Sequence, residues 1–117
     1  MKKQKITILH NTRCSKSRCA LELLEKKKAD VEVIEYLKEV PTREELKLLL
    51  AKLNMKPFEL VRQEEQLFKD KYKKLKLNDH EWIRVMLDNP ILIQRPIVVR
   101  GNKAIIARPV ELIDDLF

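Results

Sequence analysis

The pattern of apolar and polar positions predicts a strand–helix–strand unit at the start of the chain. Apolar and β-branched residues dominate Lys5 to Leu9 and again Val31 to Tyr36, as is typical of strands. Between them, apolar residues recur at helical spacing from about Ser17 to Lys28, with lysines in the last turn, where the helix dipole favours cations. Because the crossover is this long, we expect the two strands to be parallel and the connection right-handed.

The middle of the chain carries three helical patterns. Thr42 followed by Glu45 is a capping box, and leucines recur at helical spacing after it. A weaker helical pattern runs from Phe58 to about Leu77, and Asp79 is expected to cap a third helix. Strand patterns are missing between the second strand and the C-terminal region, so we expect a helical insert at about residues 42–88.

The C-terminal region returns to a β pattern. Apolar runs at Ile97–Val99 and Ala104–Ala107 flank a turn that contains Gly101, the chain's only glycine, which predicts a β-hairpin. Pro109 then begins a helix with one apolar stripe. The predicted fold class is α/β: a thioredoxin-like mixed sheet of order βαβ … ββα, with a helical insert between the two halves. We expect residues 1–117 to form a single thioredoxin-like domain.

Composition narrows the cellular setting. The basic N-terminus is followed by too short an apolar run for a signal sequence, and no stretch approaches the length of a membrane span. Two cysteines without an export signal indicate a reducing compartment and a catalytic or redox use of the thiols. We therefore expect a cytoplasmic protein with no membrane contact.

The net charge of +7 raises the question of a polyanionic partner. Much of the charge comes from lysine runs at residues 26–28 and 69–76, which we interpret as solvated helix faces, and aromatic residues are too few for base stacking. We do not expect nucleic-acid binding. A small anionic substrate is the simpler use of a positive field.

Cys14 is the main candidate for chemistry. It lies between the first predicted strand and helix, where unpaired backbone N–H groups attract anions. Cationic groups surround it in sequence, at His10, Arg13, Lys16 and Arg18. A helix N-terminus and nearby cations both favour the thiolate, so we interpret Cys14 as a reactive thiol rather than a small buried hydrophobic residue.

Three arginines have a context that suits oxyanion binding. Arg62 lies near the start of the weak helical pattern, Arg95 precedes Pro96 and a strand, and Arg108 follows the last strand. The planar guanidinium donates paired hydrogen bonds to an oxyanion. Sequence spacing alone leaves open whether these arginines converge. The Arg95–Pro96 bond is a candidate cis peptide.

Two segments carry a resemblance to a known family. His10-Asn11-x-x-Cys14-Ser15-Lys16-Ser17-Arg18 and the segment from Asn89 to Val99 resemble motifs of the glutaredoxin-coupled, thioredoxin-fold arsenate reductases, and the likeness extends over essentially the whole chain. The resemblance implies that Cys14 attacks the arsenic of arsenate. It also implies that Arg62, Arg95 and Arg108 bind the oxyanion and lower the thiol pKa, and that the bond before Pro96 is cis.

The same resemblance implies the partners. Glutathione is the expected co-substrate and glutaredoxin the expected recycling protein. Separately from the resemblance, we expect no bound cofactor, no metal ion and a monomeric chain. The matched motifs give the site the following supporting residues: His10, Asn11, Ser17, Arg18 and Pro96.

The chain departs from the family pattern at Thr12, where proline is typical, and at Cys19, where a cysteine is not expected. We interpret Cys19 as a packing residue inside the first helix, with a resolving role as the alternative. Two other functions remain open: a redox-sensing, RNA polymerase-binding regulator of the Spx type, and a general thiol oxidoreductase. The Spx type has two residues between its cysteines, whereas Cys14 and Cys19 are separated by four.

Overall fold

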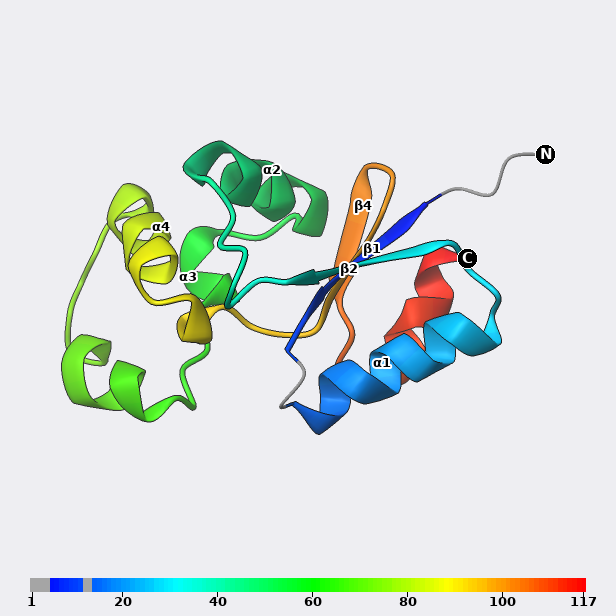
Figure 1. Cartoon of the computed structure of the whole chain (residues 1–117). Helices are drawn as coiled ribbons and strands as arrows, with labels where there is room; N and C mark the ends of the chain where they lie inside the picture. The colour runs from blue at the N-terminus through cyan, green and yellow to red at the C-terminus, as the bar shows by residue number, and fades with distance from the viewer. Residues whose placement is uncertain (1–4, 12–13) are drawn as a thin grey trace. The chain divides into compact units, whose positions relative to one another are not determined.

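The computed structural model describes residues 5–11 and 14–117, and these divide into two compact units (Figure 1). One unit combines the described residues up to Glu39 with Arg95–Phe117, and the other is Val40–Gln94.

The first unit is built on a four-stranded sheet in the order β2-β1-β3-β4. β1 (Ile6–His10) pairs in parallel with β2 (Val31–Glu35) and antiparallel with β3 (Ile97–Arg100). β3 and β4 (Lys103–Ile106) form the predicted hairpin, and Gly101 adopts the positive φ of 61° in its turn. The predicted mixed sheet, with its parallel first pair, is therefore confirmed.

Alternate residues of β1 point toward helix α1 (Ser15–Lys26). Ile6 and Ile8 are buried in one cluster with Ala20 and Leu24 of α1, because side chains two apart on a strand share a face. The C-terminal 3₁₀ helix η3 (Val110–Leu116) contributes to the same cluster. This core fixes α1 over the sheet and so fixes where α1 begins.

Leu24→Ala is expected to lower the free energy of unfolding by about 3 kcal/mol. Leu24 is fully buried in the cluster between α1 and β1, so the truncation leaves a cavity. Urea denaturation measures the change. Leu21→Ala, at a partly buried position of the same helix, is the matched control and is expected to cost less.

The second unit is helical. It contains α2 (Arg43–Leu53), the short α3 (Pro57–Leu60), the π-helical turn η1 (Phe68–Tyr72), α4 (Asp79–Asp88) and the 3₁₀ turn η2 (Pro90–Leu92). The Thr42 capping box is confirmed, since the Thr42 hydroxyl accepts from the Glu45 N–H at 3.1 Å and the Glu45 carboxylate accepts from the Thr42 N–H at 3.0 Å.

The predicted helix from Phe58 to Leu77 is wrong. Val61 is extended and forms an isolated β-bridge with Ile93, and the Arg62 N–H donates to the Leu92 carbonyl at 2.6 Å. This long-range pairing takes backbone groups that a continuous helix would use. Arg62 therefore follows a short helix instead of opening a long one.

Three other boundaries differ from the prediction. α1 begins at Ser15 and ends at Lys26, two residues earlier at each end than expected. The cap of α4 is Asn78, whose side chain accepts from the Glu81 N–H, so Asp79 is already helical. The last helix is 3₁₀, and Pro109 lies at its N-cap instead of its first position.

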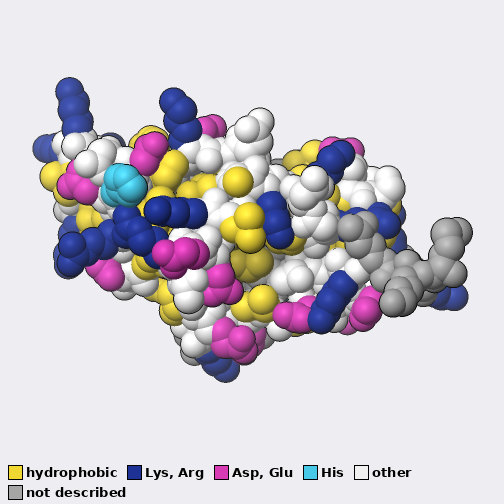
Figure 2. Space-filling view, turned by 90° about the horizontal axis from the view of Figure 1, so that it is seen from above, with side chains coloured by type: hydrophobic (Ala, Val, Ile, Leu, Met, Phe, Trp, Pro, Cys, Tyr) yellow, Lys and Arg dark blue, Asp and Glu magenta, His cyan; other side chains and the backbone are white. Residues whose placement is uncertain are grey.

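The two predicted lysine runs, 26–28 and 69–76, have their lysines exposed. Basic and acidic side chains are interspersed over the face shown in Figure 2.

Within residues 5–11 and 14–117, no helix combines the length and apolar character that a membrane crossing requires.

Candidate functional site

Strand register brings the Cys14 turn, Arg95 and Arg108 to one end of the sheet. Leu9, the residue before the end of β1, pairs with Ile97 at the start of β3. The β3–β4 ladder continues one step past the strands, since the Ala107 N–H donates to the Pro96 carbonyl at 2.9 Å. Arg95 and Arg108 flank this step, so both leave the sheet where β1 ends.

Both arginines precede a cis proline. The Arg95–Pro96 bond is cis, as predicted, and Arg108–Pro109 is also cis, which the sequence did not indicate. Arg95 is buried at 8% exposure despite its charge, and Arg108 is partly buried. Both charged side chains are therefore shielded from solvent in part, Arg95 more than Arg108.

Cys14 is the N-cap residue of α1. Its backbone N–H donates to the Asn11 carbonyl at 2.9 Å, and its carbonyl accepts from the Arg18 N–H at 3.1 Å, the first hydrogen bond of the helix. The side chain is partly buried and forms no disulfide. In this position the sulfur faces the free N–H groups of the first helical turn.

The surroundings of Cys14 lower the pKa of its thiol. Partial burial is the largest single influence and acts to raise the pKa, because it disfavours the charged thiolate. The backbone N–H groups of Ser17 and Lys16, the nearby Ser17 hydroxyl and the positive charge of Arg108 act to lower the pKa, and together they outweigh burial. The net result favours the thiolate, the nucleophilic form of cysteine.

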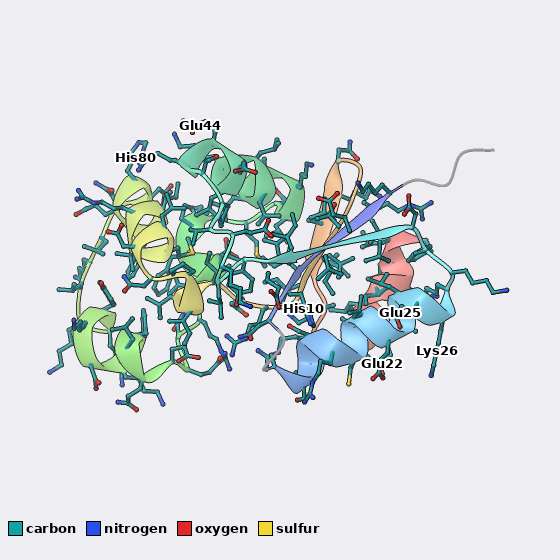
Figure 3. All side chains as sticks on the ribbon, viewed as in Figure 1. His10, Glu22, Glu25, Lys26, Glu44 and His80 are labelled. Carbon is teal, nitrogen blue, oxygen red and sulfur yellow. The ribbon has the colours of Figure 1, made fainter. Side chains whose placement is uncertain are left out.

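His10 ends β1 on the same face as Ile6 and Ile8 and is buried at 4% exposure (Figure 3). Burial is the main cause that lowers the pKa of its imidazole, and the charge of Arg18 adds to it. The carboxylate of Glu35 and the backbone of Ser17 act in the opposite direction. The first turn of α1 therefore influences the pKa of both His10 and Cys14.

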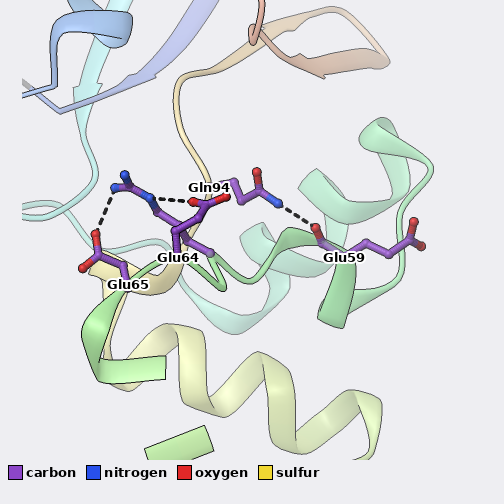
Figure 4. Close-up of polar contacts among 5 residues, drawn as sticks. Glu59, Glu64, Glu65 and Gln94 are labelled. Atoms are coloured by element: carbon purple, nitrogen blue, oxygen red, sulfur yellow. Dashed lines mark hydrogen bonds and ion pairs between the residues drawn. The ribbon is translucent and has the colours of Figure 1, made fainter. Parts of the chain in front are cut away.

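Arg62 belongs to the helical unit, where two glutamates hold it (Figure 4). Its Nε lies 3.3 Å from the Glu64 carboxylate and its Nη1 lies 3.0 Å from that of Glu65. Its side chain is largely buried. The residues that meet at the end of the sheet, by contrast, all lie in the other unit.

Cys19 does not pack in the core. Its side chain is exposed on α1, so the interpretation of Cys19 as a packing residue is wrong. The buried face of α1 carries Ser17, Ala20 and Leu24, and Cys19 lies about 100° from Ala20 and about 140° from Leu24 around the helix, so it faces solvent. Arg18 is exposed as well, and Asn11 is buried. Arg13 and Thr12 lie outside the described residues.

The sequence analysis did not identify how two residues influence the site: Lys16, which affects the pKa of Cys14, and Glu35, which affects that of His10. Lys16 was singled out for its charge, yet it acts on the sulfur through its backbone N–H. Glu35 was not singled out at all, although its place at the end of the parallel partner strand was a usable signal. Across the described part of the chain, no group of three or more His, Cys, Asp or Glu side chains is placed to hold a metal ion.

Comparison with known proteins gives consistent matches. A match to the ArsC family covers residues 9–116. An arsenate reductase from Neisseria meningitidis is 39% identical over 111 residues, which are 93% of this chain and 95% of that protein. The Escherichia coli protein YfgD is 43% identical over 110 residues, 92% of each chain.

A solved structure agrees with these matches. The arsenate reductase from Vibrio cholerae superposes with a TM-score of 0.93 at 36% identity, covering 99% of this chain and 100% of that one. This likeness confirms the predicted fold class.

Proposed function

The chain belongs to the ArsC family, and from that premise we propose that it is an arsenate reductase whose nucleophile is Cys14. The observation that carries the proposal is the Cys14 thiol, whose pKa is lowered by the first turn of α1 and by Arg108. A pre-ionised thiolate beside anion-binding N–H groups suits attack on an oxyanion.

Arginines are needed because thiolate and arsenate are both anions. We assign Arg95 and Arg108 to the oxyanion on the strength of their position at the end of the sheet, and Arg62 on the strength of the family resemblance. Donors of this kind stabilise the charge that develops on the oxygens during attack. Five further residues are proposed to support the Cys14 turn and the start of β3: His10, Asn11, Ser17, Arg18 and Pro96.

The first step forms a bond between the Cys14 sulfur and arsenic and breaks one arsenic–oxygen bond. The departing oxygen takes up protons and leaves as water. A thiol, for which we propose glutathione, then adds its sulfur to arsenic and displaces a second oxygen as water. When another thiol, proposed to belong to glutaredoxin, attacks that glutathione sulfur, a disulfide forms and two electrons pass to arsenic, which becomes arsenite on hydrolysis.

An external thiol is favoured by the geometry of α1. Cys14 is the N-cap and its carbonyl already accepts the first helical hydrogen bond, so the first turn is regular. Cys14 itself has extended backbone dihedrals, φ −98° and ψ 119°, so its side chain lies at the end of the helix, whereas Cys19 projects from the side of α1 and is exposed. The Cys14 and Cys19 sulfurs therefore face apart, and we propose that Cys19 is not the resolving thiol.

Oxidation of the protein with glutathione disulfide is expected to leave Cys14 as a mixed disulfide, without a Cys14–Cys19 bond. Mass spectrometry of the intact chain and of its peptides distinguishes the two products. Cys19→Ser is expected to retain thiol-dependent turnover. A predominant species two hydrogens lighter than the reduced chain, with Cys14 linked to Cys19, would contradict this prediction.

The test of the proposed function is arsenate-dependent oxidation of NADPH in the presence of glutathione, glutaredoxin and glutathione reductase. Turnover that requires arsenate and each thiol component is expected. Thiol–disulfide exchange with no response to arsenate would instead favour a general thiol oxidoreductase. Replacing glutaredoxin with thioredoxin identifies the recycling system, and binding to RNA polymerase without turnover would favour the Spx-type alternative.

A further inference from the structure

Two glutamates contact Arg62, the residue of the helical unit that the proposed function assigns to the oxyanion (Figure 4). The Arg62 Nε–H donates a hydrogen bond to the Glu64 carboxylate at 3.3 Å, and Arg62 Nη1 lies 3.0 Å from the Glu65 carboxylate. Both glutamates follow Arg62 closely in sequence, so these contacts form within one short stretch of chain. The positive charge that would attract an anion is therefore already matched by carboxylates.

The atoms that the glutamates contact leave no complete pair of free donors on the guanidinium. An oxyanion is bound most strongly through two parallel N–H groups, which a guanidinium offers on two edges: Nε with Nη2, and Nη1 with Nη2. Glu64 engages the Nε of the first edge, and Glu65 faces the Nη1 of the second. Binding of an oxyanion through paired donors of Arg62 therefore requires at least one carboxylate to move away.

The contacts with both carboxylates are weak enough to be exchanged. The Glu64 side chain is 71% exposed, so water can replace its contact with Arg62 at small cost. Glu65 is less exposed, but Arg62 Nη1 is buried and, among residues 5–11 and 14–117, has no acceptor aligned for a hydrogen bond. A donor at this atom therefore remains available to a better-placed oxygen.

The backbone of Arg62 is fixed, whereas its side-chain contacts are not. The Arg62 N–H donates to the Leu92 carbonyl at 2.6 Å, and the preceding residue, Val61, forms the β-bridge with Ile93. This pairing ties Arg62 to the segment that leads along the chain into Arg95. A change of partner at the guanidinium thus needs only side-chain rotation and leaves the backbone pairing in place.

We propose that Glu64 and Glu65 compete with the oxyanion for Arg62, which exchanges between these carboxylates and the substrate anion. The apparent affinity for the anion then falls with the fraction of Arg62 that the glutamates hold. The same contacts give the largely buried guanidinium a counter-charge when no anion is bound. The inference rests on the proposed function, because that function assigns Arg62 to the oxyanion.

Isothermal titration calorimetry with inorganic phosphate, an unreactive analogue of arsenate, measures the competition in the reduced protein. Glu64→Gln removes a competing charge and keeps the side-chain length, so the Kd for phosphate is expected to fall about threefold. Glu65→Gln is expected to change the Kd in the same direction. Glu44→Gln removes one negative charge from an exposed position of α2 in the same unit and should leave the Kd near the wild-type value.

A double-mutant cycle separates competition for Arg62 from a general effect of charge. In the Arg62→Ala background, Glu64→Gln has no guanidinium to release and is expected to leave the Kd for phosphate unchanged. An equal fall in Kd in both backgrounds overturns the proposal, as does an unchanged Kd in both single glutamate variants.

The Arg62 Nε–H resonance, assigned by its loss in Arg62→Ala, gives a second measurement by ¹⁵N–¹H NMR. In the wild type it is expected to shift on addition of phosphate, because Nε changes its acceptor, and in Glu64→Gln it should be shifted before phosphate is added. A resonance that does not respond to saturating phosphate overturns the proposal. If these responses occur but arsenate is not turned over, the competition is supported and the proposed function is contradicted.

Discussion

Cys14→Ser is expected to abolish arsenate-dependent turnover, with a loss of about a thousandfold or more. The hydroxyl of serine stays protonated in the turn where the thiol ionises, so the variant has no nucleophile at neutral pH. The surrounding N–H donors and arginines remain in place. Binding of the oxyanion should therefore survive the loss of chemistry.

The control measurement for Cys14→Ser is its free energy of unfolding. Cys14 is a partly buried N-cap residue, and serine is a preferred N-cap, so the free energy of unfolding is expected to change by no more than about 1 kcal/mol. Cys19→Ser, in the same helix, is the matched control for loss of a thiol. Turnover by Cys14→Ser at the wild-type rate would rule out Cys14 as the nucleophile.

Arg108→Ala is expected to lower kcat/KM for arsenate by roughly a hundredfold and to shift the Cys14 titration upward. The guanidinium is proposed to bind the oxyanion, and its charge also favours the thiolate. In the wild type the alkylation rate should rise with pH to a plateau, with its midpoint below the usual thiol pKa of about 8.5, because the pKa of the Cys14 thiol is lowered. In the variant the plateau moves to higher pH.

Two comparisons sharpen the Arg108 result. Arg108→Lys keeps a charge near the sulfur but loses the planar fork, so the titration should stay near wild type while the KM for arsenate rises. Arg84→Ala removes an exposed arginine paired only loosely with Asp88 in α4 and should change neither quantity. An Arg108→Ala enzyme with a wild-type pH profile and rate would remove Arg108 from the site.

Local sequence patterns determined much of the first unit and one helix start in the second. The hairpin around Gly101 and the parallel first strand pair of the first unit, and the Thr42 capping box of the second, follow from neighbouring residues, whose preferences act over a few positions. The reactive character of Cys14 was visible for the same reason. A thiol between a strand and a helix faces the free N–H groups of that helix wherever the rest of the chain lies.

Predictions from local patterns were wrong where a distant segment pairs with backbone groups that a helix would otherwise use. The continuous helix expected after Phe58 is interrupted because Val61 pairs with Ile93, about thirty residues away, and no local signal marks that pairing. Cys19 was interpreted as a packing residue because it lies inside the helical pattern, but it is about 100° from Ala20 and about 140° from Leu24 around the helix and so misses the buried face.

Strand register decided which residues come together at the candidate site. Arg95, Arg108 and the Cys14 turn meet at one end of the sheet only because Leu9 pairs with Ile97 and the hairpin ladder extends to Pro96. The pairing of Glu35 with His10 likewise exists only in the parallel ladder. The sequence by itself determined which groups are able to bind and attack an anion. Tertiary structure decided which of them are neighbours, because register depends on how the whole sheet packs against α1.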